Sequence, residues 1–138
     1  MFRPRIMPCL LLKGKGLVKT IQFKNPTYLG DPINAVKIFN EKETDELIFL
    51  DIIATTENRS IDLDLVKNIG DECYMPFAVG GGIRSVDTIK KIFNAGAEKV
   101  VLNTYAISNP DFVSEAANIF GSQSIVVSID AKKKLFGK

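Results

Sequence analysis

Short apolar runs alternate along the chain with segments of helical periodicity, and this alternation restricts the fold more than any other feature of the sequence. In the clearest run, residues 46–53, nearly every side chain is apolar, as in a strand buried on both faces of a parallel sheet. The pattern predicts strands at residues 6–12, 46–53, 77–79, 99–102 and 124–129, a further extended segment at 17–23 after the turn at 14–16, and helices at 32–42, 61–72, 86–94 and 110–120. This order implies right-handed βαβ crossovers and a parallel sheet, either doubly wound or closed as a barrel.

The composition is typical of a globular protein and argues against several classes of function. The 138 residues are 46% hydrophobic and 25% charged, so we expect one domain over residues 1–138. Lys and Arg outnumber Asp and Glu by only 18 to 16, which favours no nucleic-acid partner. No apolar run approaches the roughly 20 residues that cross a bilayer, and no signal-peptide pattern is present, so we expect a cytoplasmic protein with no membrane partner.

The chain contains no histidine and two cysteines, Cys9 and Cys73. Neither cysteine lies in a CxxC or metal-ligand pattern, so we expect two free thiols, no metal site and no cofactor. A His-based catalytic triad is excluded. Any acid/base chemistry must come from carboxylates, Lys, Tyr or Cys.

Residues 78–85, Ala-Val-Gly-Gly-Gly-Ile-Arg-Ser, join an apolar strand to the start of a helix. Glycines let the backbone turn sharply and approach a ligand closely, and the first N–H groups of a helix are unpaired donors at the positive end of its dipole. Ser85 is the expected N-cap of that helix, as Asp31 before Pro32 is of the first helix. The pattern is that of a phosphate site built from backbone, with Gly81 and Gly82 at its centre. The alternative is a tight turn that binds nothing.

Polar and glycine residues gather where the strands end, and charged residues lie where three strands start. The strand ends carry Asp51, Asn103, Thr104 and Asp130 besides the glycines, and ligands bind at the carboxyl ends of parallel strands. Arg5, Glu46 and Lys99 lie at corresponding strand starts. From the residues alone, these three charges are expected to form salt bridges that close one end of a barrel.

A series of motifs along the whole chain resembles one known family. The motifs are Arg3-Pro4-Arg5-Ile6, Cys9-Leu10, Gly30-Asp31-Pro32, Asp45-Glu46-Leu47, Leu50-Asp51-Ile52, Val79-Gly80-Gly81-Gly82-Ile83, Gly96-Ala97-Glu98-Lys99-Val100, Asn103-Thr104, Phe120-Gly121-Ser122-Gln123 and Ile129-Asp130-Ala131-Lys132. In this order and spacing they resemble the cyclase subunit of imidazole glycerol phosphate synthase, a (β/α)8 barrel that works with a glutaminase subunit. The resemblance implies the N-terminal half of such a TIM barrel, four βα units plus strand five, with the second half absent from this chain.

The resemblance also implies roles for individual residues. In that family, ammonia from the glutaminase enters at the barrel bottom, crosses the core, and reacts at the top with a substrate that carries two phosphates. By position, Gly82, Asn103 and Thr104 match the phosphate site of the first half-barrel, in agreement with Gly81 and Gly82 from the turn. The same comparison makes Arg5, Glu46 and Lys99 members of a charged ammonia gate, and places Glu98 on the face that meets the glutaminase. Lys19 and Asp51 are candidate substrate contacts.

One position departs from the family pattern. The cyclases carry two essential aspartates, which act as general acid and base. The second is present here as Asp130, the candidate catalytic residue, but the first position is Leu11, which can neither give nor take a proton. With residues 9–12, 16–20 and 30–36, this leucine makes the chain similar to paralogues in surface-polysaccharide gene sets, which are thought to deliver ammonia for acetamidino-type sugar modification.

Three functions therefore remain open. The first is an ammonia-channelling, cyclase-like subunit of a glutamine amidotransferase system, with a glutaminase partner and a phosphorylated small-molecule substrate or partner enzyme, serving sugar amination or amidination. The second is the true cyclase of histidine biosynthesis. The third is a catalytically inert binding or assembly module, since a half-barrel with Leu11 is expected to be inactive as a cyclase by itself. A half-barrel leaves apolar residues uncovered, so we also expect a homo-oligomer.

Overall fold

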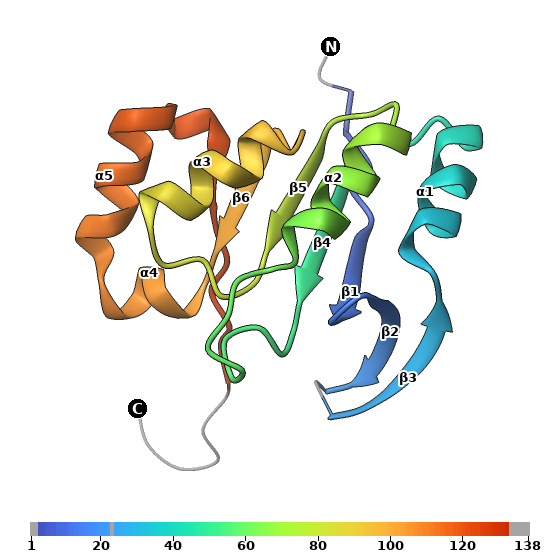
Figure 1. Ribbon diagram of the computed structural model, residues 1–138, viewed down its shortest axis with the longest axis horizontal. Helices are drawn as coiled ribbons and strands as arrows, with labels where there is room; N and C mark the ends of the chain where they lie inside the picture. The colour runs from blue at the N-terminus through green and yellow to red at the C-terminus, as the bar shows by residue number, and fades with distance from the viewer. Residues whose placement is uncertain (1–2, 23, 133–138) are drawn as a thin grey trace.

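The computed structural model describes residues 3–22 and 24–132, which form one seven-stranded sheet with helices beside it (Figure 1). The strands are β1 (Cys9–Lys13), β2 (Gly16–Ile21), β3 (Lys24–Gly30), β4 (Leu47–Asp51), β5 (Phe77–Gly80), β6 (Lys99–Leu102) and β7 (Ile125–Val127). The helices are α1 (Pro32–Glu41), α2 (Leu63–Glu72), α3 (Val86–Asn94), α4 (Thr104–Ser108) and α5 (Pro110–Phe120), followed by a 3₁₀ helix at Ser122–Ser124.

The strands lie in the order β3-β2-β1-β4-β5-β6-β7. In the part of the sheet with the order β1-β4-β5-β6-β7, all neighbouring strands are parallel. Because every new parallel strand adds at the same edge, right-handed crossovers put the connecting helices on one face of the sheet. Over the described residues the fold is thus a mostly parallel α/β sheet that stays open, consistent with part of a (β/α)8 barrel, and the predicted fold class is confirmed.

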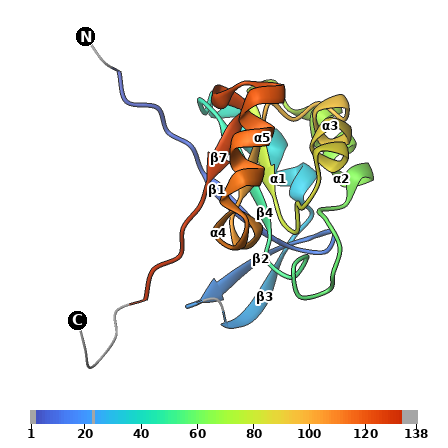
Figure 2. The same ribbon diagram turned by 90° about the vertical axis from the view of Figure 1, so that its left-hand side faces the viewer.

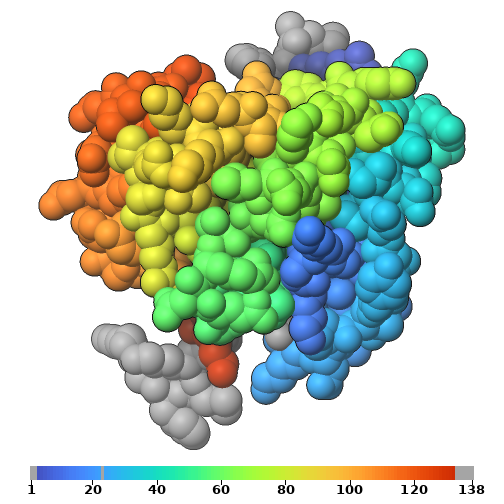
Figure 3. Space-filling view, viewed as in Figure 1, coloured from blue at the N-terminus to red at the C-terminus, as the bar shows by residue number. Residues whose placement is uncertain are grey.

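Alternate side chains of each strand face the helices. Leu12 on β1 and Phe49 on β4 are fully buried, whereas Leu11 and Leu50 are half-buried and face the opposite side. Figure 2 shows α2 and α3 on one side of the strands, and in Figure 3 the side chains of α1, α2, α3 and α5 cover the face seen in Figure 1. The core lies between sheet and helices, and its largest fully buried side chains are Phe49, Leu12, Leu47, Ile61, Ile69, Ile89, Ile92, Leu102, Val36, Val66, Val79 and Val100.

Two helices begin at the caps that the sequence predicts. The Asp31 carboxylate accepts a hydrogen bond from the Ile33 N–H at 2.8 Å, with Pro32 as the first residue of α1. The Ser85 hydroxyl accepts one from the Thr88 N–H at 3.1 Å, which starts α3. These caps satisfy backbone donors that have no partner inside the helix.

The sheet is mostly parallel, and its antiparallel part lies beyond β1. β2 pairs antiparallel with β1, and β3, which was not expected, pairs antiparallel with β2. The expected extended segment at residues 17–23 is therefore the middle strand of a meander, and its last residue, Phe23, lies outside the described residues. Helix α4 was not expected either, because five residues are too few to show a helical period.

Three predicted strands are shorter than the apolar runs that indicated them. β1 begins at Cys9 rather than Ile6, because Pro4 and Pro8 have no N–H to give to a ladder. β4 ends at Asp51, where the chain turns into the loop before α2. β7 begins at Ile125 because the residues before it form the 3₁₀ helix.

Candidate functional site

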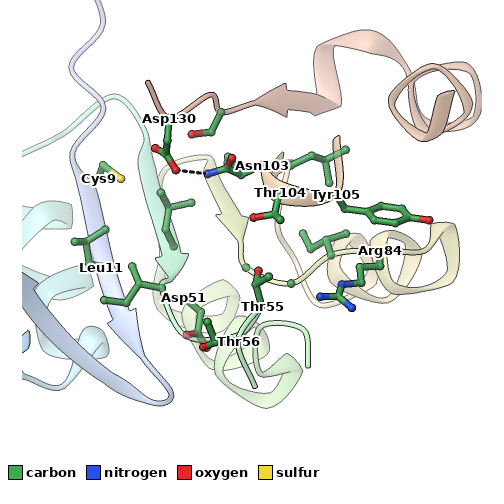
Figure 4. Close-up of a pocket in the computed structure, with 18 of the residues that line it drawn as sticks. Cys9, Leu11, Asp51, Thr55, Thr56, Arg84, Asn103, Thr104, Tyr105 and Asp130 are labelled. Carbon is green, nitrogen blue, oxygen red and sulfur yellow. Dashed lines mark hydrogen bonds between the residues drawn. The ribbon is translucent and has the colours of Figure 1, made fainter. Parts of the chain in front are cut away.

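A pocket of about 720 Å³ opens at the carboxyl ends of the parallel strands. Figure 4 shows most of its residues, which come from β1, β2, β4, β6, α4 and the segments that follow β2, β4, β5, β6 and β7. The predicted site residues that line it are Asp51, Gly81, Gly82, Asn103, Thr104 and Asp130. The structure thus gathers the predicted phosphate-binding residues and the candidate catalytic carboxylate around one space.

The glycine turn forms one side of this pocket. Gly81 and Gly82 have φ angles of 132° and 62°, which L side chains rarely adopt. A Cβ at Gly81 would lie 2.8 Å from the Asp51 carbonyl oxygen, and one at Gly82 would overlap the Arg59 carbonyl oxygen. Only glycine fits at these positions, and the turn leads directly into α3, whose N-terminal N–H groups are suited to an anion.

Asn103, Thr104 and Asp130 form a polar part of the pocket wall, at the ends of the strands next to the turn (Figure 4). The Asn103 Nδ2 donates a hydrogen bond to the Asp130 Oδ2 at 2.9 Å, which joins the end of β6 to the segment after β7. Asp130 is exposed, so its other carboxylate oxygen is open to solvent and to a ligand. Thr104 is the first residue of α4 and its hydroxyl can either donate or accept a hydrogen bond.

Asp51 also lines the pocket, but both oxygens of its carboxylate already accept hydrogen bonds from other groups of the protein. The side chain is 0% exposed, and its Oδ2 accepts a hydrogen bond from the Arg59 Nη1 at 2.6 Å. Its Oδ1 accepts one from the Ile53 N–H at 3.1 Å. Hydrogen bonds to Asp51 and Glu57 raise the pKa of Arg59 above its ordinary value, so this guanidinium stays charged. The predicted substrate contact at Asp51 stays a prediction, and the geometry favours a supporting role.

The β1 and β4 side of the pocket is apolar. It consists of Cys9, Leu11 and Leu50, and Figure 4 shows Cys9 and Leu11 on the same strand, across the pocket from Arg84. Leu11 therefore lies inside the candidate site, at the position where the resembled cyclases carry a carboxylate. This wall can pack against carbon atoms of a ligand but cannot move a proton.

Lys19 is not among the residues that line the pocket. It lies on β2 and is exposed, whereas the next residue, Thr20, lines the pocket. Successive side chains of a strand point to opposite faces, which separates these two neighbours. Contact between Lys19 and a substrate stays a prediction.

Arg5, Glu46 and Lys99 meet at the other end of the sheet. The Glu46 carboxylate pairs with the Arg5 Nη1 at 2.5 Å and with the Lys99 Nζ at 2.7 Å. The Glu46 side chain is only 6% exposed, so these two cations offset the cost of burying its charge. The predicted salt-bridged cluster is present, and its role as an ammonia gate stays a prediction. Glu98, the residue before β6 in the sequence, is exposed next to this cluster.

Sequence reasoning missed two arginines of the site, Arg59 and Arg84. Arg84 lines the pocket and donates a hydrogen bond to the Asn58 Oδ1 at 3.1 Å. Among the described lining residues it is the one Lys or Arg. Its position two residues after Gly82 was a signal from which the sequence could have placed it at the site. Arg59 lies eight residues after Asp51 in an irregular loop, so no spacing rule links the two.

The described residues contain neither a helix that could span a membrane nor a cluster of metal-ligand side chains. None of the helices in residues 3–22 and 24–132 has the length and apolar character needed to span a membrane. In the same residues, no three or more Cys, Asp or Glu side chains gather as a metal ion would require.

Comparison with known proteins finds a matching family and several similar proteins. The model of the family described as histidine biosynthesis protein matches residues 5–138. The chain is 51% identical over 137 residues to a Pseudomonas aeruginosa protein named "Putative imidazole glycerol phosphate synthase subunit hisF2", covering 99% of the chain and 55% of that protein. It is 48% identical over 134 residues to "Imidazole glycerol phosphate synthase subunit HisF" of Streptococcus mutans, covering 97% of the chain and 53% of that protein. The chain thus spans about half the length of the curated relatives it matches.

Proposed function

Because the chain belongs to the histidine biosynthesis protein family, we propose that it supplies the phosphate-binding part of a synthase subunit of the imidazole glycerol phosphate synthase type. The observation that carries this proposal is the convergence of Gly81, Gly82, Asn103 and Thr104 on one pocket at the carboxyl ends of the strands. Relatives named as subunits of that synthase, at 44 to 51% identity, support it.

A phosphate group suits this pocket for three reasons. The glycine turn lines the pocket with backbone that no side chain covers, so its N–H groups can approach an anion closely. Asn103 and Thr104 offer side-chain donors at the end of the neighbouring strand β6. Arg84 brings a positive charge, while Arg59 neutralises the carboxylate of Asp51. The ligand we propose is a phosphate monoester whose carbon skeleton packs on Leu11 and Leu50.

Asp130 is the acid/base residue in this proposal. Its carboxylate is exposed to the pocket and is oriented by the Asn103 amide at 2.9 Å. Asp51 is a poorer candidate, because both of its carboxylate oxygens already accept hydrogen bonds. In ring closure, Asp130 would take a proton from the attacking nitrogen and return one to the leaving oxygen.

The proposed nitrogen source is ammonia from a glutaminase subunit that docks at the strand-start end, near Glu98. In this proposal the Arg5–Glu46–Lys99 cluster, at the same end of the sheet, is the gate through which the ammonia enters. A cluster of two cations around one buried carboxylate can open and reclose by moving a single long side chain. The exposed Arg5, at 63% side-chain exposure, is the member that we expect to move.

One observation favours a second candidate function. Leu11 leaves the pocket without a second free carboxylate opposite Asp130. A subunit that conducts ammonia to another acceptor, such as a sugar under amination or amidination, needs the phosphate site and the gate but not that carboxylate. This candidate accounts for Leu11 directly, whereas a cyclase must work with Asp130 alone.

Ammonia-dependent turnover of the phosphoribulosyl formimino substrate distinguishes the two. The protein at full length is assayed with ammonium salt, as the parent, as Leu11→Asp and as Leu11→Asn, which matches the shape of aspartate but does not ionise. Turnover by the parent supports the cyclase. Absence of turnover by the parent contradicts it and favours the second candidate, and a gain of about 10²-fold or more in Leu11→Asp over Leu11→Asn would show that the missing base is the reason.

A further inference from the structure

The loop at residues 52–61, between β4 and α2, packs directly against the glycine turn, and the Asp51–Arg59 ion pair lies where the two meet. We propose that Arg59 is a positioning residue for the phosphate site: its guanidinium, held by Asp51, fixes the loop in the shape against which Gly81 and Gly82 present their N–H groups. The inference rests on the proposed function, because it assigns a role within that site.

The ion pair is buried at one end, and both of its residues make further hydrogen bonds. Asp51 has a fully buried side chain and contacts Arg59 at 2.6 Å, while Arg59 is 33% exposed. The Arg59 Nε also pairs with the Glu57 Oε2 at 2.6 Å, and its Nη1 donates to the Ser60 carbonyl oxygen at 3.2 Å. A buried carboxylate is stable only with such partners, so the guanidinium has one favourable position.

The backbone of the same residues forms the surface on which the turn lies. The Ile61 N–H donates to the Gly81 carbonyl oxygen at 2.9 Å. The Asp51 carbonyl oxygen and Cβ lie within 2.9 Å of where a Gly81 Cβ would be, and the Arg59 carbonyl oxygen occupies the space of a Gly82 Cβ. Any shift of the Arg59 backbone is therefore a shift of the turn.

Arg59 also neutralises the negative charge of the Asp51 carboxylate. Asp51 lines the same pocket as Gly81 and Gly82. Without the guanidinium, an unpaired carboxylate at this position would repel a phosphate. Loss of Arg59 therefore weakens phosphate binding in two ways, through the shape of the turn and through charge.

The test measures the affinity for inorganic phosphate from the shifts of the Gly81 and Gly82 amide resonances. It compares the parent chain with the variants Arg59→Ala, Arg59→Lys and Lys67→Ala. Lys67→Ala is the matched control, because it breaks an exposed ion pair with Asp71 on α2, outside the pocket. We expect Arg59→Ala to bind phosphate at least about tenfold more weakly, with faster hydrogen exchange at the Ile61 amide. Arg59→Lys should recover part of the affinity, and added methylguanidinium should recover part of it in Arg59→Ala. A pair that only stabilised the fold would give none of these site-specific effects.

A double variant separates the two causes. Adding Asp51→Asn to Arg59→Ala removes the unpaired charge, so we expect it to restore part of the affinity while exchange at Ile61 stays fast. If Arg59→Ala does not fold, Arg59→Lys carries the test, with weaker binding expected than in the parent. Unchanged affinity in folded Arg59 variants would overturn the inference alone, and a parent chain that binds no phosphate at this turn would overturn the proposed function with it.

Discussion

At the scale of single residues, Gly82 is the position in the site that tolerates substitution least. Two separate constraints act there: a φ angle of 62° and the Arg59 carbonyl oxygen in the space of a Cβ. Gly14 has the same φ of 62° but nothing within 4 Å of its Cβ position. The two glycines therefore share the conformational constraint and differ in the steric one.

This pair gives a matched prediction. Gly14→Ala should lower the free energy of unfolding by about 1 kcal/mol, because alanine adopts this conformation at a cost of that order. Gly82→Ala should lower it by more, about 2 to 4 kcal/mol, because the turn must also move away from Arg59. Urea unfolding measures both. Equal losses in the two variants would mean that loop 52–61 yields to the added methyl group, contrary to the packing described.

Leu11 illustrates how far single residues could be interpreted from sequence. Its apolar character and its place at the end of the first strand were evident, and the pocket wall of Cys9, Leu11 and Leu50 agrees with that place. The state of Asp51 was not evident, because its partner Arg59 comes from an irregular loop whose path no periodicity describes. Long-range ion pairs of this kind depend on the folded loop and have no local signal.

At the scale of elements, the N-cap of α2 yields a pH-dependent prediction. Asp62 accepts a hydrogen bond from the Leu65 N–H at 2.9 Å and lies 3.5 Å from the Lys15 Nζ. The hydrogen bond from the Leu65 backbone holds the pKa of Asp62 below its ordinary value of 3.8. A carboxyl whose pKa is lowered by folding stabilises the protein above its unfolded-state pKa, and this contribution is lost as the pH falls through the folded-state pKa.

Asp62→Ala should therefore cost about 1 kcal/mol of unfolding free energy at neutral pH. The gap between parent and variant should shrink once the pH falls below about 4, the ordinary range of an aspartate. Urea unfolding at a series of pH values measures this gap. Asp64→Ala, an exposed change in the same helical turn, is the control and should have a smaller effect. A gap that does not depend on pH would rule out the charged cap as the cause.

The elements themselves were largely predictable, and the exceptions have physical causes. The buried strands β4, β5 and β6 and the amphipathic helices α1, α2, α3 and α5 carry strong apolar patterns, so their existence and order followed from the sequence. β3 did not, because Lys24, Asn25 and Pro26 are poor strand formers. An exposed edge strand needs little apolar surface, and its outer N–H groups need no partner but water, so proline is tolerated there.

At the scale of the whole molecule, the two ends of the parallel sheet have different chemistry. The carboxyl ends hold the pocket with Asn103, Thr104 and the glycine turn, and the strand starts hold the buried Glu46 with its two cations. Both groups of residues could be located from strand order alone, because parallel strands align their ends. Exposed apolar side chains lie at the β7 edge of the sheet, including Val127 on β7 and Ile129 after it, and the expected homo-oligomer stays a prediction.

The phosphate site is tested by titrating the isotope-labelled chain with glycerol 3-phosphate and following its amide resonances by NMR, with glycerol as the control ligand. We expect saturable shifts at Gly81, Gly82 and Thr104 with the phosphate ester and none with glycerol, since the N–H groups of the turn would bind the phosphate. Shifts confined to exposed lysines such as Lys13 and Lys15, or no saturable shift at the glycine turn, would contradict a phosphate site at this turn.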